Sequence, residues 1–161
     1  MISIDSYFLN HFSAKRFPRW QLFWNIFSDA KILAIVMYAL PVLYLFFFAD
    51  NWSAIFKLTG SVIASIVIGY VLKAIILRPR PHNHITYLGK SDSSFPSLHT
   101  LCAFNLAFLL SSYFPQIGIT WYIYACLVGM ARMYVQVHYF TDVIGGLVLG
   151  TGLAWGILNL L

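Results

Sequence analysis

The chain has 161 residues, of which 60% are hydrophobic, 18% aromatic and only 9% charged. Charged residues make up about a quarter of an ordinary soluble domain, so the composition excludes that class and indicates a membrane protein. Ten Lys and Arg residues stand against five acids, all Asp, and the formal net charge is +5. We expect an anionic partner such as a lipid headgroup or phosphate and no nucleic acid, because the cations are scattered among apolar runs. The alternative is that these cations only flank membrane spans and set their orientation.

The first 28 residues mix Phe, Trp and Tyr with cations. This segment, 1–28, predicts an N-terminal amphipathic helix in the membrane interface, with an ordinary flanking segment as the alternative. A helix needs roughly 20 mostly apolar residues to cross the hydrocarbon. The predicted fold is therefore an all-α integral membrane domain, 1–161, with a bundle of about five transmembrane helices at 32–48, 54–72, 98–114, 117–131 and 143–161. The last of these spans contains small residues that predict close helix packing, Gly145, Gly146, Gly150 and Gly156.

One long hydrophilic stretch, residues 73–97, follows the second predicted span and contains three of the six prolines. The run Arg78-Pro79-Arg80-Pro81 cannot continue a regular helix, so we expect an ordered loop at the membrane surface. Counting spans puts this loop on the same side as the N-terminus and the polar segment 132–142. Six ionisable residues can therefore meet in one pocket: Lys73, Arg80, His99, Arg132, His138 and Asp142.

This combination of residue types predicts a site for a phosphate group. Lys and Arg neutralise phosphate oxygens, and the planar guanidinium suits bidentate contact. Ser97 begins the third span, where a helix N-terminus offers free N–H groups to an anion. His138 and Asp142 are four residues apart, so on a helix the carboxylate can orient the imidazole as a nucleophile or general base.

Each of these residues also has a plainer interpretation when it is taken alone. Lys73 could anchor a helix at the interface, and Arg80 could be a solvated or headgroup-binding loop cation. His99 could be a structural histidine, and Arg132 could pair with Asp142. His82 and His84 form an H-x-H pair, but no Cys or Glu stands nearby, so a surface loop is favoured over a zinc site.

Three segments resemble the signature of the type 2 phosphatidic acid phosphatase (PAP2) family, which shares its site with vanadium haloperoxidases. "KAIILRPRP" corresponds to the motif Lys, six residues, Arg-Pro. "PSLH" corresponds to Pro-Ser-Gly-His, with Leu98 in place of glycine. "ARMYVQVHYFTD" corresponds to Ser-Arg, five residues, His, three residues, Asp, with Ala131 in place of serine. The order and spacings agree, which makes this signal far more specific than any single motif.

The resemblance implies a PAP2/haloperoxidase-like core and a two-step phosphoryl transfer without metal or cofactor. His138 is expected to attack phosphorus and form a phosphohistidine, while Asp142 orients it and His99 acts as acid and then as base. The remaining site residues are expected to bind the phosphate: Lys73, Arg80, Ser97 and Arg132. The absence of Glu independently disfavours a magnesium site. A non-catalytic protein that binds or transports a lipid phosphate is the alternative, although binding needs neither a nucleophile nor an acid.

The resemblance offers four lipid substrates: phosphatidylglycerol phosphate, phosphatidic acid, undecaprenyl diphosphate and lipid A 1-phosphate. It also implies a bacterial inner membrane, with the site facing the periplasm or exterior. The cations oppose this orientation, since nine of the ten lie on or near the site side and only Lys57 lies near the other. The count stays biased toward the site side when Lys73, Arg80 and Arg132 are set aside as phosphate ligands, and we follow the resemblance. Nothing in the sequence selects one lipid or an oligomeric state.

Overall fold

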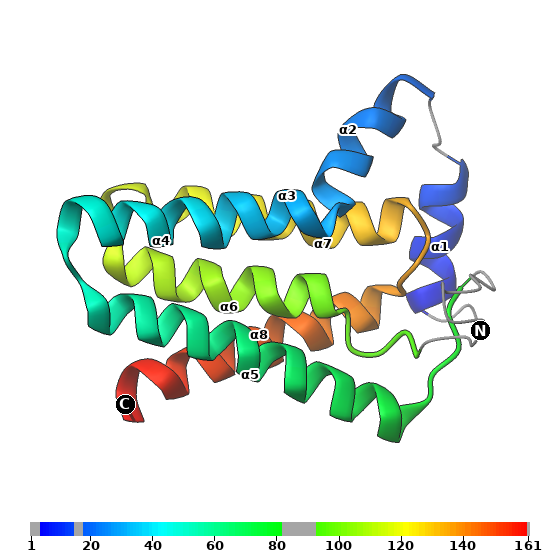
Figure 1. Cartoon of the computed structure of the whole chain (residues 1–161). Helices are drawn as coiled ribbons and strands as arrows, with labels where there is room; N and C mark the ends of the chain where they lie inside the picture. The colour runs from blue at the N-terminus through cyan, green and yellow to red at the C-terminus, as the bar shows by residue number, and fades with distance from the viewer. Residues whose placement is uncertain (1–3, 15–17, 82–92, 161) are drawn as a thin grey trace.

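The computed structural model describes residues 4–14, 18–81 and 93–160, and these residues form a bundle of helices without a strand (Figure 1). The N-terminal part contains α1 (Ile4–Ala14) and α2 (Pro18–Ser28). A helical run follows, with α3 (Ala30–Ala34), η1 (Ile35–Ala39), α4 (Leu40–Tyr44) and η2 (Leu45–Ala49). The rest of the chain forms α5 (Trp52–Ile76), α6 (Leu98–Tyr113), η3 (Pro115–Ile117), α7 (Gly118–Tyr134) and α8 (Phe140–Leu160).

The run from Ala30 to Ala49 is one apolar helix interrupted by wider π turns. It begins at Asp29, whose side chain accepts hydrogen bonds from the backbone N–H groups of the first turn at 2.7 and 3.2 Å. Pro41 lies inside the run and lacks the N–H that a regular helix needs. Because a proline ring crowds the preceding turn, the π turn at Ile35–Ala39 gives the ring room without ending the helix.

The five predicted spans each correspond to a helical region, with shifted ends. Among the residues that the structure describes, three regions are long and apolar enough to cross a membrane: Ala30–Ala49, Trp52–Ile76 and Phe140–Asn159. Helix α6 has 16 residues and α7 has 17, which is shorter than the roughly 20 that a span needs on its own. These two helices pack against each other, and α6 is largely buried whereas α7 exposes side chains such as Ile119 and Ile123.

Helix α6 is the centre of the bundle and contacts α5, α7 and α8. Its approach to α8 depends on glycines, as predicted. A Cβ at Gly146 would lie 2.8 Å from the carbonyl oxygen of Ser97, and one at Gly150 would collide with the backbone of Leu101. The small residues thus bring the two backbones together. The same prediction is wrong for Gly156, which faces open space.

The predicted N-terminal interfacial helix is in fact two helices, α1 and α2. Both lie at the end of the bundle where α5 ends and where α7 turns into α8 (Figure 1). Aromatic contacts attach them to the bundle: Phe8 stacks on Phe140 with ring centroids 4.3 Å apart, and Trp24 stacks on Tyr134 at 5.3 Å. Other aromatic and aliphatic side chains, including that of Leu22, are exposed, as expected of a surface in the membrane interface.

Candidate active site

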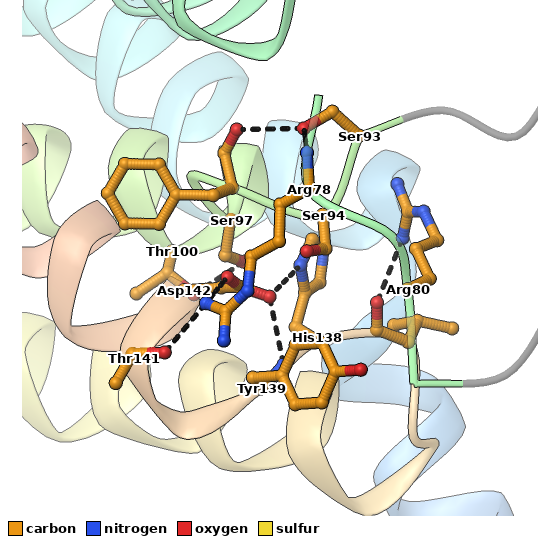
Figure 2. Close-up of polar contacts among 12 residues, drawn as sticks. Arg78, Arg80, Ser93, Ser94, Ser97, Thr100, His138, Tyr139, Thr141 and Asp142 are labelled. Atoms are coloured by element: carbon orange, nitrogen blue, oxygen red, sulfur yellow. Dashed lines mark hydrogen bonds and ion pairs between the residues drawn. The ribbon is translucent and has the colours of Figure 1, made fainter. Parts of the chain in front are cut away.

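The polar loop after α5 is fixed at both of its described ends. Leu77 ends α5 in a left-handed conformation with φ 49°. The returning chain then holds the next residue: Ser93 Oγ accepts a hydrogen bond from Arg78 N at 3.0 Å, and Ser94 N donates to Arg78 O at 2.8 Å (Figure 2). This pairing keeps Arg78 and Arg80 beside the starts of α6 and α8. His82 and His84 lie outside the described residues.

His138 and Asp142 meet, although not for the predicted reason. His138 lies in the turn between α7 and α8, where Gln136 has φ 59°, and Asp142 lies in the first turn of α8. The two residues therefore do not share a helix. Their side chains are buried, with His138 Nδ1 3.5 Å from Asp142 Oδ2 (Figure 2). Within the described structure Nδ1 has no hydrogen-bond partner, so this contact is mainly electrostatic and leaves Nε2 on the opposite edge of the ring.

The surroundings of His138 favour its neutral form. The pKa of the imidazole is lowered from 6.5 to about 4, mainly by burial and also by the charges of Arg132 and Arg80, while Asp142 acts to raise it. The ring is therefore neutral near pH 7. A neutral imidazole with one nitrogen facing a carboxylate has the protonation state that a nucleophile requires.

The two predicted arginines lie close to both histidines. Arg80 Nη1 donates to the carbonyl oxygen of Val137 at 3.1 Å, and Arg132 Nη1 donates to Ser28 O at 2.9 Å and Ser28 Oγ at 2.6 Å. The charges of both arginines act on His138 and on His99, which lies in the first turn of α6. A pairing of Arg132 with Asp142 is not observed.

Lys73 and Ser97 support the site through the backbone. Lys73 is buried, and its Nζ donates to the carbonyl oxygen of Ser93. Ser97 is buried at the start of α6, where its Oγ accepts from Thr100 Oγ1 at 2.9 Å and its N–H donates to the carbonyl oxygen of Asp142 at 3.1 Å. The predicted binding of phosphate by these two residues remains a prediction.

Sequence reasoning missed Arg78, which forms an ion pair with Asp142 at 2.6 Å. From the sequence, Arg78 was interpreted only as one of the loop cations. Its second carboxylate partner is Asp5, with Arg78 Nη2 2.5 Å from Asp5 Oδ2. The two residues are 73 positions apart in the sequence. The arginine stands two residues before Arg80 in a basic, proline-containing run, which is the one local signal of its position.

An apolar pocket with a volume of about 210 Å³ adjoins His99. Its lining comes from α3, η1, α5 and α6 and includes Leu33, Ile66, Leu98 and Cys102. Leu98, which replaces the motif glycine, points toward α5, where a Cβ at Gly69 would lie 2.6 Å from its Cδ1. The leucine thus shapes an apolar surface next to the proposed acid. Among the residues that the structure describes, no group of three or more His, Cys, Asp or Glu could hold a metal ion.

Residues 54–161 match the PAP2 superfamily, and this region contains every predicted site residue. The chain belongs to the PAP2 superfamily. The family that the three motifs predicted is therefore confirmed, and with it an all-α membrane protein.

Two curated relatives of this PAP2 protein come from Bacillus subtilis (strain 168). It is 35% identical to undecaprenyl-diphosphatase BcrC over 121 residues, which cover 71% of this chain and 63% of the relative. It is 32% identical to phosphatidylglycerophosphatase B over 119 residues, which cover 66% of this chain and 57% of the relative. The chain thus spans less than two thirds of the length of these relatives.

The crystal structure of Aquifex aeolicus LpxE has the same fold as this PAP2 protein. The two structures agree with a TM-score of 0.80 at 24% identity, over 98% of this chain and 96% of the other. The described helices and their order therefore correspond to those of a solved protein over nearly its whole length.

Proposed function

We propose that this protein is a metal-independent membrane lipid phosphatase that hydrolyses a phosphate monoester or diphosphate. The observation that carries the proposal is the buried contact of His138 with Asp142, beside His99 and two arginines. A protein that only binds a lipid phosphate needs cations, but it does not need a neutral histidine held against a buried carboxylate. The family, and the activities in the names of the two relatives, support the enzymatic interpretation.

The reaction has two steps. In the first, His138 Nε2 attacks phosphorus, the N–P bond forms, the bond from phosphorus to the leaving oxygen breaks, and protonated His99 gives that oxygen a proton. In the second, His99 takes a proton from water, the water oxygen attacks phosphorus, and the N–P bond breaks to release phosphate. The phosphate oxygens are held throughout by Lys73, Arg80, Ser97 and Arg132.

The pocket beside His99 supports a lipid as the substrate. The charges of Arg80 and Arg132 act on His99, and the same residue lines the apolar pocket together with Leu98 and Cys102. A molecule with a phosphate next to a hydrocarbon chain matches both surfaces. Undecaprenyl diphosphate and phosphatidylglycerol phosphate are favoured by the names of the relatives, and phosphatidic acid and lipid A 1-phosphate complete the set. We place the enzyme in a bacterial inner membrane, with its site toward the periplasm or exterior.

The test is release of phosphate by the purified protein in detergent, with EDTA present, from each of the four lipids. We expect phosphate release to continue in the presence of EDTA, and the rates for the four lipids give the order of substrate preference. The variant His138→Ala should lose at least about a thousandfold in kcat, because removal of a nucleophile leaves only binding and electrostatic contributions. Lys57→Gln, at the far end of the bundle, is the control for removal of a polar side chain. Equal rates for His138→Ala and the wild type would refute the phosphohistidine route.

A further inference from the structure

The carboxylate of Asp142 is shared between two sides of the site. Its Oδ2 accepts a hydrogen bond from Tyr139 N at 2.9 Å and faces His138 Nδ1 at 3.5 Å. Its Oδ1 accepts from Arg78 Nη1 at 2.6 Å (Figure 2). The side chain of Asp142 is fully buried, whereas that of Arg78 is 27% exposed. The direction of the carboxylate is therefore set from the loop side by one guanidinium.

Arg78 is itself held on three sides. Nη1 also donates to Thr141 Oγ1 at 2.7 Å, and Nη2 donates to Asp5 Oδ2 at 2.5 Å. The guanidinium carbon lies 4.4 Å from the centre of the Tyr139 ring, within the range of a cation–π contact. Burial acts to lower the pKa of Arg78, but the carboxylates of Asp5 and Asp142 outweigh it and raise that pKa. The arginine is thus a fixed, permanently charged group.

Asp5 ties this arrangement to the N-terminal helix. Its Oδ1 accepts from Thr141 N at 3.0 Å, and Thr141 Oγ1 lies 2.8 Å from Oδ2. Thr141 belongs to the first turn of α8, where free N–H groups and the positive end of the helix dipole favour a carboxylate. Asp5 of α1 therefore caps α8 and holds Arg78 with the same side chain.

The hydrogen bonds that Arg78 already donates within the protein disfavour a role in binding phosphate. Each terminal guanidinium nitrogen carries two hydrogens. Both hydrogens of Nη1 are used by Asp142 and Thr141, and Nη2 is directed to Asp5. Arg132 contrasts with this, because both of its described acceptors are uncharged oxygens of Ser28.

We propose that Arg78 is a positioning residue that clamps Oδ1 of Asp142. The clamp keeps Oδ2 facing His138, so that the proton of the imidazole stays on Nδ1. Asp5 anchors the clamp by holding Arg78. The proposal rests on the proposed function, since it assigns a role in preparing His138 Nε2 for attack. Loss of the clamp leaves the phosphate ligands in place but frees the carboxylate to turn. The cost is therefore expected in kcat, and little is expected in the affinity for phosphate.

The kinetic test compares Arg78→Gln, Arg78→Lys, Asp142→Asn and the double variant Arg78→Gln/Asp142→Asn, with Lys57→Gln as the control for a lost cation. We expect Arg78→Gln to lower kcat on the order of 100-fold, with KM and inhibition by orthovanadate changed less than about threefold. Arg78→Lys keeps the charge without the fork and should be intermediate. In the Asp142→Asn background, Arg78→Gln should cost less than about threefold more, because both act on one carboxylate.

Two results would overturn the proposal. Weaker orthovanadate inhibition with unchanged kcat would make Arg78 a phosphate ligand, and losses that multiply in the double variant would make it independent of Asp142. Thermal unfolding in detergent identifies a variant that has lost its fold. In that case Asp5→Asn replaces Arg78→Gln in the kinetic test, because it keeps the arginine and weakens its anchor. We expect a smaller loss in kcat from Asp5→Asn.

A measurement on the resting protein separates this proposal from the proposed function. Histidine labelled with ¹⁵N reports by NMR which ring nitrogen carries the proton, and the His138 signal is identified by its absence in His138→Gln. We expect the Nδ1–H form in the wild type and a mixture of forms in Arg78→Gln. The same form in both proteins would refute the clamp. Wild-type protein that releases no phosphate from any lipid would refute the proposed function, while the NMR comparison would still decide on Arg78.

Discussion

The imidazole of His138 lies among two arginines and one carboxylate, and burial together with the two cations outweighs the carboxylate. Burial and the nearby cations of Arg132 and Arg80 lower its pKa to about 4, while Asp142 acts in the opposite direction. The carboxylate therefore has two separable effects: it stabilises the imidazolium, and it holds the ring in place. A phosphotransfer to Nε2 needs the second effect and a neutral ring.

The pH dependence of His138 follows from these influences. In the wild type, an NMR titration of the ring should show a midpoint well below the ordinary 6.5, near the pKa of about 4 that burial and the neighbouring charges give it. Asp142→Asn removes the one influence that raises the pKa, so the midpoint should move to lower pH. At the same time kcat should fall by on the order of 10⁴, as when an orienting carboxylate is lost. A wild-type midpoint at 6.5, or an upward move in Asp142→Asn, would contradict the electrostatic account.

At the residue scale, the spacing of residues within a motif was enough to predict the contact between His138 and Asp142. His138 and Asp142 are four residues apart, and the structure brings them into contact even though a turn replaces the predicted helix. Arg78 could not be recognised, since its role depends on Asp5 at the start of the chain. No pattern in one sequence reports that an N-terminal carboxylate folds back onto a loop 73 residues later.

At the scale of elements, the close approach of α6 and α8 positions the chemistry. The first turn of α8 carries Asp142, and the first turn of α6 carries His99. Ser97 N, at the start of α6, donates to the backbone carbonyl of Asp142 at 3.1 Å. Any change that separates the two helices therefore also separates His99, the proposed acid, from Asp142, the carboxylate proposed to orient His138.

Gly150 and Gly152 provide a matched pair for this packing. A Cβ at Gly150 would collide with the carbonyl oxygen of Leu101, whereas one at Gly152 meets nothing within 4 Å. We expect Gly150→Ala to destabilise the protein by about 1–3 kcal/mol, the usual cost of overpacking, and to lower activity. Gly152→Ala should be neutral or slightly stabilising, because alanine favours a helix. Thermal unfolding in detergent checks both, and equal midpoints for the two variants would show that the helices can separate without cost.

The helices were predictable from the sequence where a long apolar run alone determines that a helix forms. Long apolar runs located every helical region of the bundle, and Pro115 marked the end of the third. The π turns around Pro41 were not predicted, because they depend on how the run accommodates a proline inside the bundle. The division of the N-terminal segment into α1 and α2 was missed as well, although Pro18 stands at the start of the second helix.

At the scale of the whole molecule, the charges gather at one end of the bundle. Four of the cations described at that end are held by the protein: Arg78 by two carboxylates, Arg80 by the carbonyl oxygen of Val137, Arg132 by Ser28, and Lys73 by the carbonyl oxygen of Ser93. A cation that is bound in this way serves the site and need not stay on the cytoplasmic side. The positive-inside tendency concerns basic residues in the loops that flank spans, so these residues are weak evidence for a cytoplasmic site.

With these cations set aside, we expect the site end of the bundle to face the exterior, which the cation count opposes. Single cysteines can be placed at the two ends of the bundle after Cys102 and Cys126 are replaced by alanine: Tyr7→Cys in α1 at the site end and Gln116→Cys in η3 at the far end, both at exposed positions. In bacterial spheroplasts, a membrane-impermeant maleimide should label Tyr7→Cys at once and Gln116→Cys only after the membrane is permeabilised. The phosphate site then faces the exterior, as required for a lipid phosphate in the outer leaflet. The opposite labelling pattern would place the site in the cytoplasm, and the loop cations would then set the topology as the positive-inside tendency states.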